Sequence, residues 1–280
     1  MPFEALAIIT SVTNAIGVVF IAKGMRGTTA SVAAIYSVAV QEAILTVILV
    51  SRRPTFNMLA VGFFALSGLL ALGIGRLLNF VAMKQIGVAK TSALIGSNPV
   101  LTTLLSVFML SERPEFTVIV GVVSVAMGIV LVSGARGFKV EKALLIGMAS
   151  ALSYSLSNIA GKMGLSIQPD PYLSSQRGAA AGLLFFVVYL AFTSRAGSLR
   201  IGMLSLLYFS ATGIVSSVGW IAMMKALELG SVSVVTTIVF SYPLFSIIFT
   251  RLMIREEPLR GTTVIGSILI VLGVVIVTLL

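Results

Sequence analysis

The sequence predicts an all-α integral membrane protein, with ten transmembrane helices arranged as an inverted repeat of five plus five. Hydrophobic residues fill 58% of the 280 positions and charged residues only 10%, whereas about a quarter of the residues of a soluble domain are charged. Apolar runs of about 20 residues, the length that crosses a bilayer, follow one another along the chain. The order of motifs in the first half recurs in the second. We therefore expect a multi-pass protein of the cell membrane, with the lipid bilayer as its surroundings.

The apolar runs define the expected spans, which are separated by short polar turns. They lie at 3–22, 31–50, 58–80, 91–110, 116–134, 143–163, 172–194, 202–225, 231–253 and 261–280. The turns carry Pro, Gly or paired charges, which start and stop helices. The run that begins after Glu4 lacks the basic segment of a cleavable signal, so we interpret it as the first permanent helix. The turns leave no room for an ATPase domain, so energy for any transport must come from gradients or from a separate protein.

The composition excludes most catalytic chemistry. The chain contains no Cys and no His, and Asp170 is its only Asp. Zinc motifs, Ser-His-Asp triads and intramembrane aspartate pairs therefore cannot form. The net charge of +10 comes from Lys and Arg residues near the ends of apolar runs, where such residues anchor helices at lipid headgroups. We expect no enzyme, no cofactor or metal, and no nucleic-acid partner.

An internal repeat relates residues that lie 144 positions apart, as Ala82 and Ala226 do. The other matched pairs are Ser97 with Ser241, Pro99 with Pro243, Met109 with Met253, Glu112 with Glu256, and Pro114 with Pro258. Each half, 1–138 and 139–280, then holds five helices, and this odd number makes the second copy enter the membrane in the opposite sense. Inverted repeats are typical of secondary transporters, which bind their solute near the midplane between the halves. A scaffold can also arise by duplication, so the repeat favours transport without proving it.

These features resemble the drug/metabolite transporter superfamily, EamA type, over essentially the whole chain. The resemblance rests on the helix number, the duplication, the mid-helix prolines, and the turns Ser111-Glu112-Arg113-Pro114 and Arg255-Glu256-Glu257-Pro258. Ser111 and Arg255 depart from the Gly that usually begins this turn. The resemblance implies a secondary active transporter, an exporter or exchanger of a small metabolite, amino acid or drug that works by alternating access without ATP. The alternative is a non-transporting membrane scaffold or assembly subunit with a packed interior.

Glu42 and Arg177 are ionisable residues placed within expected spans, where charge is costly and usually faces a cavity or a partner. Glu42 is interpreted as a proton-coupling or cation-binding carboxylate, or equally as half of a structural ion pair. Arg177 lies on the counterpart helix, so the two side chains would form a gate if they met. Alternatively Arg177 extends to the interface, because Pro171 lies only six residues upstream.

Arg76 and Asn79 lie about one turn apart near the end of the third span, so they share a face. A guanidinium beside an amide suits a carboxylate or phosphate, although an interfacial anchor would look the same. Trp220, the only Trp, occupies a similar place in the second half. It would stack on an aromatic or cationic solute, or belong to the interfacial belt.

Asn98 and Tyr242 directly precede the two mid-helix prolines and are counterparts in the repeat. A mid-helix proline frees a backbone carbonyl, so these residues either repair the kink or line a cavity, facing each other across the halves. In the sixth span, serines at 150, 153 and 157 suggest close packing. Tyr154 and Asn158 are bulkier and are predicted in the cavity wall. Asn14, in the first span, completes the predicted substrate-binding set.

The leading hypothesis from the sequence is a monomeric transporter with a cavity lined by helices 1, 3, 4, 6, 8 and 9. Its expected partners are a small-molecule substrate and a coupling ion or counter-substrate. Basic residues concentrate in the odd-numbered loops, which places both termini outside by the positive-inside rule. The family resemblance implies both termini inside.

Overall fold

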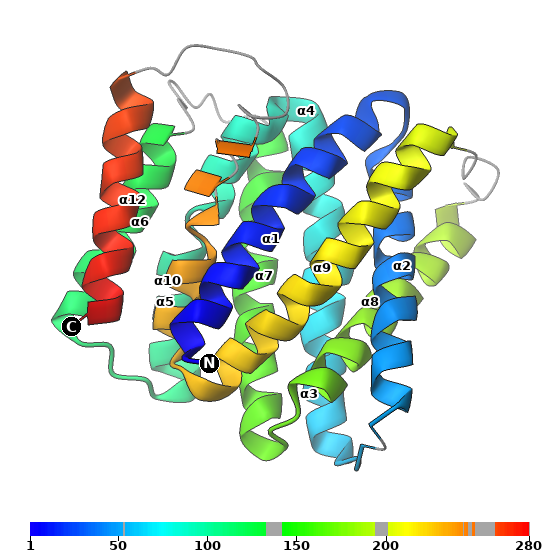
Figure 1. The fold of residues 1–280 in the computed structure, drawn as a ribbon, viewed down its shortest axis with the longest axis horizontal. Helices are drawn as coiled ribbons and strands as arrows, with labels where there is room; N and C mark the ends of the chain where they lie inside the picture. Colours follow the sequence, from blue (N-terminus) through cyan, green and yellow to red (C-terminus); the bar gives the residue numbers. More distant parts are fainter. Residues whose placement is uncertain are drawn as a thin grey trace.

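The computed structural model describes residues 1–52, 54–132, 142–193, 201–242, 244–245, 248–249 and 261–279. Regular structure within these ranges is entirely helical. Helix is present inside every predicted span (Figure 1). Pro243, Glu256 and Pro258, three markers of the repeat, lie outside the described residues. The inverted ten-helix arrangement and the boundary between residues 138 and 139 therefore stay predictions.

The first half begins with two helices of membrane-spanning length and continues into one long irregular helix. Its elements are α1 (Phe3–Gly24), the short 3₁₀ helix η1 (Met25–Gly27), α2 (Ala30–Val50), α3 (Met58–Gly68), the π-helical segment η2 (Leu69–Gly75) and α4 (Arg76–Ile95). Thr29 caps α2 by accepting the Val32 N–H, and Asn57 caps α3 by accepting the N–H groups of Leu59 and Ala60. Such caps satisfy backbone donors that have no partner in the first turn.

The fourth predicted span, 91–110, is not one continuous helix. The chain kinks at Gly87, whose φ of 83° favours glycine, and α4 ends at Ile95. A new helix, α5 (Asn98–Leu110), begins with Pro99 in its first turn, where the missing N–H has no cost. It ends at Ser111 in the left-handed conformation with φ of 55°, and α6 (Phe116–Val132) follows.

The second half contains α7 (Lys142–Ile167), α8 (Pro171–Thr193), α9 (Met203–Leu229), α10 (Val232–Val239) and α12 (Gly261–Leu279). The turn between α7 and α8 follows the sequence signals, because Asp170 accepts the N–H groups of Tyr172 and Leu173 directly after the break. Ser231 caps α10 in the same way. Helices α7 and α9 run about one turn beyond their predicted ends.

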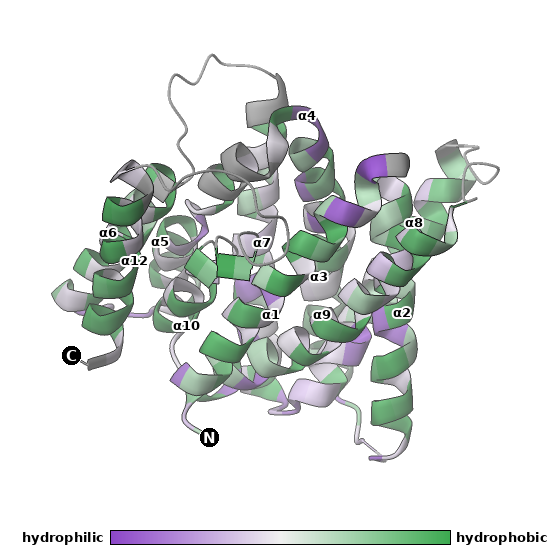
Figure 2. Cartoon of the chain, turned by 45° about the horizontal axis from the view of Figure 1, so that its top comes forward, coloured by the Kyte–Doolittle hydropathy of each residue, from purple (hydrophilic) through white to green (hydrophobic). Residues whose placement is uncertain are grey.

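Several helices are long and apolar enough to cross a membrane. Among the described residues these are Phe3–Gly24, Ala30–Val50, Met58–Gly87, Pro171–Phe192 and Met203–Leu229. Large hydrophobic side chains such as Phe108, Phe192 and Leu207 are exposed on the outer surface, and Figure 2 shows that hydrophobic residues are spread along most of the helices. An apolar outer surface requires lipid as its solvent, so the chain is a multi-pass membrane protein.

The helices pack in pairs that join the two halves. Helix α1 packs along α9, α3 and α4 pack on α7, α2 packs on α8, and α6 packs on α12 (Figure 1). The closest approach lies between Gly68 and Gly178, where a Cβ on Gly68 would come within 1.9 Å of the Gly178 carbonyl oxygen. Small residues at such points let backbones approach, the usual solution in membranes.

Candidate solute-binding cavity

A cavity of about 140 Å³ lies inside the helix bundle. Its walls come from α1, α2, η2 and α4 of the first half and from α7, α9 and the end of α10 in the second. Drug-sized ligands usually occupy pockets of about 300–1,000 Å³. In the conformation described, the space is therefore smaller than a typical drug-sized pocket.

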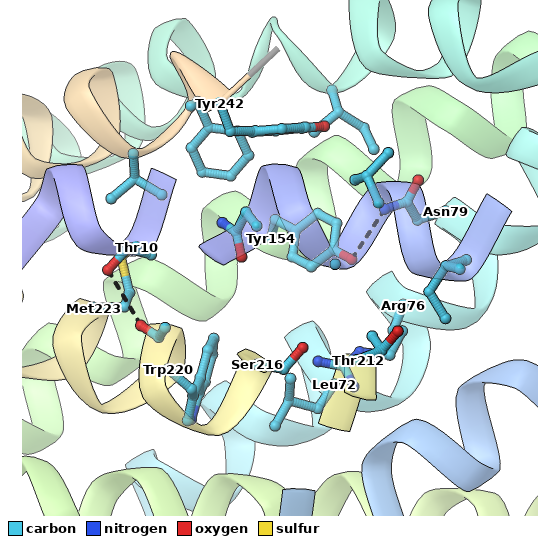
Figure 3. Close-up of a pocket in the computed structure, with 18 of the residues that line it drawn as sticks. Thr10, Leu72, Arg76, Asn79, Tyr154, Thr212, Ser216, Trp220, Met223 and Tyr242 are labelled. Carbon is cyan, nitrogen blue, oxygen red and sulfur yellow. Dashed lines mark hydrogen bonds between the residues drawn. The ribbon is translucent and has the colours of Figure 1, made fainter. Parts of the chain in front are cut away.

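One wall of the cavity is polar and carries a positive charge. The Arg76 guanidinium donates from Nη2 to Gln41 Oε1 at 3.0 Å and from Nη1 to Ser37 Oγ at 3.5 Å. One turn further along α4, Asn79 Nδ2 donates to the Tyr154 hydroxyl at 3.4 Å (Figure 3). An arginine side chain stays protonated in proteins, so this wall is permanently cationic.

The remaining wall is largely aromatic. Trp220 from α9 and Tyr154 from α7 border the same space as Tyr242, which follows α10 (Figure 3). The ring of Phe240 lies 6.5 Å from that of Tyr154 and 6.3 Å from that of Tyr242, both in edge-on arrangements. The Trp220 indole Nε1 is buried without a hydrogen-bond partner. These rings offer apolar surface beside a few polar atoms.

The π-helical segment η2 helps to place Arg76 in the cavity. A π turn leaves the regular i→i+4 ladder, and α7 supplies hydroxyl donors to carbonyls in this stretch. Ser150 Oγ donates to the Gly75 carbonyl at 2.9 Å and Ser153 Oγ to the Leu70 carbonyl at 2.6 Å. The serine stripe of α7 therefore holds the helix that carries Arg76, in agreement with the predicted packing role.

Seven of the ten residues predicted to bind substrate line this cavity. They are Asn14, Arg76, Asn79, Tyr154, Asn158, Trp220 and Tyr242. The predicted helices 1, 3, 4, 6, 8 and 9 all contribute to the lining, and the second helix adds Gln41. Whether these residues bind substrate stays a prediction.

Asn98 is not among the residues that line the cavity. Its Nδ2 donates to the Ala151 carbonyl at 3.0 Å and to Ser155 Oγ at 2.9 Å, and its Oδ1 accepts from Thr102 at 3.1 Å. The side chain is fully buried. Asn98 thus ties the start of α5 to α7.

Glu42 and Arg177 also lie outside the cavity lining. Glu42 Oε1 accepts hydrogen bonds from Gln176 Nε2 and Thr46 Oγ1, each at 2.8 Å. The Arg177 guanidinium lies over the Phe56 ring, 5.1 Å from its centroid. Gln176 of α8 is therefore the hydrogen-bond partner of Glu42 at the contact between α2 and α8. Among the residues that the structure describes, no hydrogen bond or ion pair joins Glu42 to Arg177, so the predicted gate contact is absent.

Sequence reasoning missed several residues of the cavity wall. The prediction chose Glu42 and not its neighbour Gln41, yet consecutive helical residues point about 100° apart, so Gln41 faces the cavity and Glu42 faces α8. Thr212 and Ser216 also line the space. Thr212, Ser216 and Trp220 follow one another at intervals of four residues, which places all three on one face of α9. This spacing is the sequence signal that would have identified Thr212 and Ser216.

The fold and cavity are those of a multi-pass helical membrane protein with an internal pocket. The model of the EamA-like transporter family matches residues 2–134 and again 141–279. The chain therefore belongs to the EamA-like transporter family. It is 22% identical over 223 residues to an uncharacterized transporter of Clostridium kluyveri, a match that covers 77% of this chain and 71% of the relative. One solved crystal structure shares the fold, with a TM-score of 0.77 at 19% identity over 99% of this chain and 95% of its own.

Proposed function

We propose that this protein is a secondary active transporter that binds a small solute in the central cavity and moves it by alternating access. The observation that carries the proposal is the position of the cavity: its walls come from both predicted halves. A site at the interface of two repeats is exposed to opposite sides of the membrane when one half rocks against the other. The solute then crosses without a large movement of its own.

The helix contacts support an inverted repeat as the basis of this movement. If the two halves are equivalent, each helix of one half has a counterpart in the other. A contact between two helices must then also be present between their two counterparts. The contact of α1 with α9 becomes that of α7 with α3 and α4, and both are present. The pairs α2 with α8 and α6 with α12 each map onto themselves, and both are present.

The α2–α8 contact carries a carboxylate suited to coupling. Glu42 Oε2 is buried without a hydrogen-bond partner, while Oε1 is held by Gln176 and Thr46. Protonation stabilises a carboxylate that has one oxygen without a hydrogen bond inside a membrane bundle. We propose that Glu42 carries the coupling proton at a place separate from the cavity.

The scaffold alternative predicts a packed interior, and the cavity with its unpartnered polar atoms favours transport instead.

Purified protein in proteoliposomes would be assayed for uptake and counterflow of labelled small metabolites. The triple variant Glu42→Gln, Arg76→Ala, Tyr242→Ala is expected to abolish flux. Leu104→Ala is the control, because Leu104 is exposed on the outer surface of α5. Equal flux in the triple variant and in the wild type would refute the assignment of the site.

A further inference from the structure

We propose that the cavity recognises a small organic carboxylate, whose negative charge binds to Arg76 and whose apolar body lies against the aromatic wall. This rests on the proposed function, because it takes the cavity to be the solute site. Four features of the cavity support it: its charge, its unused hydrogen-bonding groups, its aromatic wall and its size.

The charge of the cavity is positive and uncompensated. Arg76 is the only Lys, Arg, Asp or Glu among the lining residues. Its hydrogen-bond partners, Gln41 and Ser37, are both neutral, and it forms no ion pair with any residue that the structure describes. A guanidinium inside a membrane bundle gains more from an anion than from neutral groups, because water no longer stabilises its charge.

Hydrogen-bond donors are in excess beside this charge. The guanidinium offers five N–H groups, and the two bonds to Gln41 and Ser37 leave others unused. Gln41 Nε2 is a further buried donor without a partner. A planar carboxylate matches a guanidinium through two parallel hydrogen bonds, so this group fits the free donors best.

The aromatic wall determines which group attached to the carboxylate fits the cavity. Trp220, Tyr154 and Phe240 present ring surfaces to the same cavity, and such surfaces prefer apolar or aromatic groups. Asn79 Oδ1 is a buried acceptor without a partner, which would suit a hydroxyl or the ammonium of an amino acid. With about 140 Å³ available, one small ring and a short chain are the appropriate size.

A cationic solute is disfavoured by the same observations. Among the residues that the structure describes, no carboxylate lines the cavity, and Glu42 is engaged by Gln176 and Thr46 outside it. A cation would also enter a space that already contains a guanidinium, and like charges at close range are repulsive in a medium of low dielectric constant.

Trp220 gives a direct binding assay, since it is the only tryptophan of the chain and lines the cavity. Its emission would be followed in detergent-purified protein during titration with four probes: 3-phenylpropionate, 3-phenylpropan-1-ol, 3-phenylpropylamine and L-phenylalanine. These share one ring and one chain length and differ in charge. We expect saturable emission changes with 3-phenylpropionate at concentrations where the alcohol and the amine have no effect. The response to L-phenylalanine then shows whether Asn79 accepts an ammonium beside the carboxylate.

Three variants make the test specific to Arg76. Arg76→Gln should weaken binding of 3-phenylpropionate at least about tenfold, whereas Arg76→Lys keeps the charge and should retain part of the preference for the anion. Arg113→Gln removes the same charge from an exposed turn between α5 and α6 and should bind like the wild type. Retention of wild-type affinity in Arg76→Gln, an equal response to alcohol and acid, or no response to 3-phenylpropionate would each overturn the inference.

The binding assay and the flux assay fail independently. Binding of 3-phenylpropionate at Trp220 without any flux in proteoliposomes would contradict the proposed function and leave the preference for carboxylates standing. Flux of neutral or cationic solutes, with no anion binding at Trp220, would contradict the carboxylate inference and leave transport standing.

Discussion

The Glu112 carboxylate accepts the backbone N–H of Val232 at 2.7 Å, and so binds the turn after α5 to the first residue of α10. The hydroxyl of Ser233 donates to its other oxygen at 2.8 Å. An anion at a helix N-terminus satisfies backbone donors and opposes the helix dipole. Glu112 belongs to the turn whose sequence is repeated in the two halves. Its physical role is to cap a helix of the other half.

Glu112→Gln is expected to loosen this connection between the halves. The amide keeps the shape of the side chain but loses its charge, and the capping hydrogen bonds weaken. The melting temperature in detergent should fall by an amount equivalent to about 1 kcal/mol. Arg113→Gln is the control, since Arg113 is exposed in the same turn between α5 and α6. Equal melting temperatures for the two variants would contradict a capping role.

Gly68→Ala should prevent α3 from packing on α8. The added Cβ would meet the backbone of Gly178, which has no flexible side chain to move aside. We expect a loss of about 3 kcal/mol or more, seen as poor recovery of monodisperse protein and a lower melting temperature. Gly62→Ala has open space around the new Cβ and should be neutral or slightly stabilising. Similar behaviour of both variants would show that the contact is not tight.

Ser153→Ala should affect the π-helical segment rather than the cavity. The substitution removes the donor to the Leu70 carbonyl, and a lost hydrogen bond between membrane helices costs about 1 kcal/mol. Ser124→Ala is the control, because the Ser124 hydroxyl donates within its own helix, to the Val120 carbonyl. Thermal unfolding of both variants checks this, and a larger loss for Ser124→Ala would refute the role given to Ser153.

Glu42→Gln should separate coupling from binding. Gln keeps an oxygen for Thr46 but cannot carry the coupling proton, so flux in proteoliposomes should no longer respond to a pH gradient. Because Glu42 does not line the cavity, the emission of Trp220 with bound 3-phenylpropionate should be unchanged. A pH response equal to that of the wild type would remove Glu42 from the coupling mechanism.

The positions of the helices were largely predictable because the bilayer sets the length of each apolar run and polar turns interrupt it. The predicted span 116–134 and the observed α6 (Phe116–Val132) begin at the same residue. Pro99 was expected in the middle of a kinked helix but lies in the first turn of α5, and the extent of the long irregular helix through η2 was not predicted. A π turn depends on donors from α7, which the local sequence of η2 does not contain.

The sequence by itself determined that this chain is a helical membrane protein, that its halves share motifs, and that polar residues such as Arg76 and Trp220 lie on the same few helices as the cavity. The tertiary structure decided which of those side chains meet. Gln41 and Glu42 are adjacent in the chain, yet one binds Arg76 at the cavity and the other binds Gln176 on α8. Asn98 was predicted in the cavity, but in the structure its side chain binds to α7. The physical reason is that helix periodicity fixes the relative directions of side chains on one helix, whereas rotation and contact with neighbouring helices fix what each side chain touches.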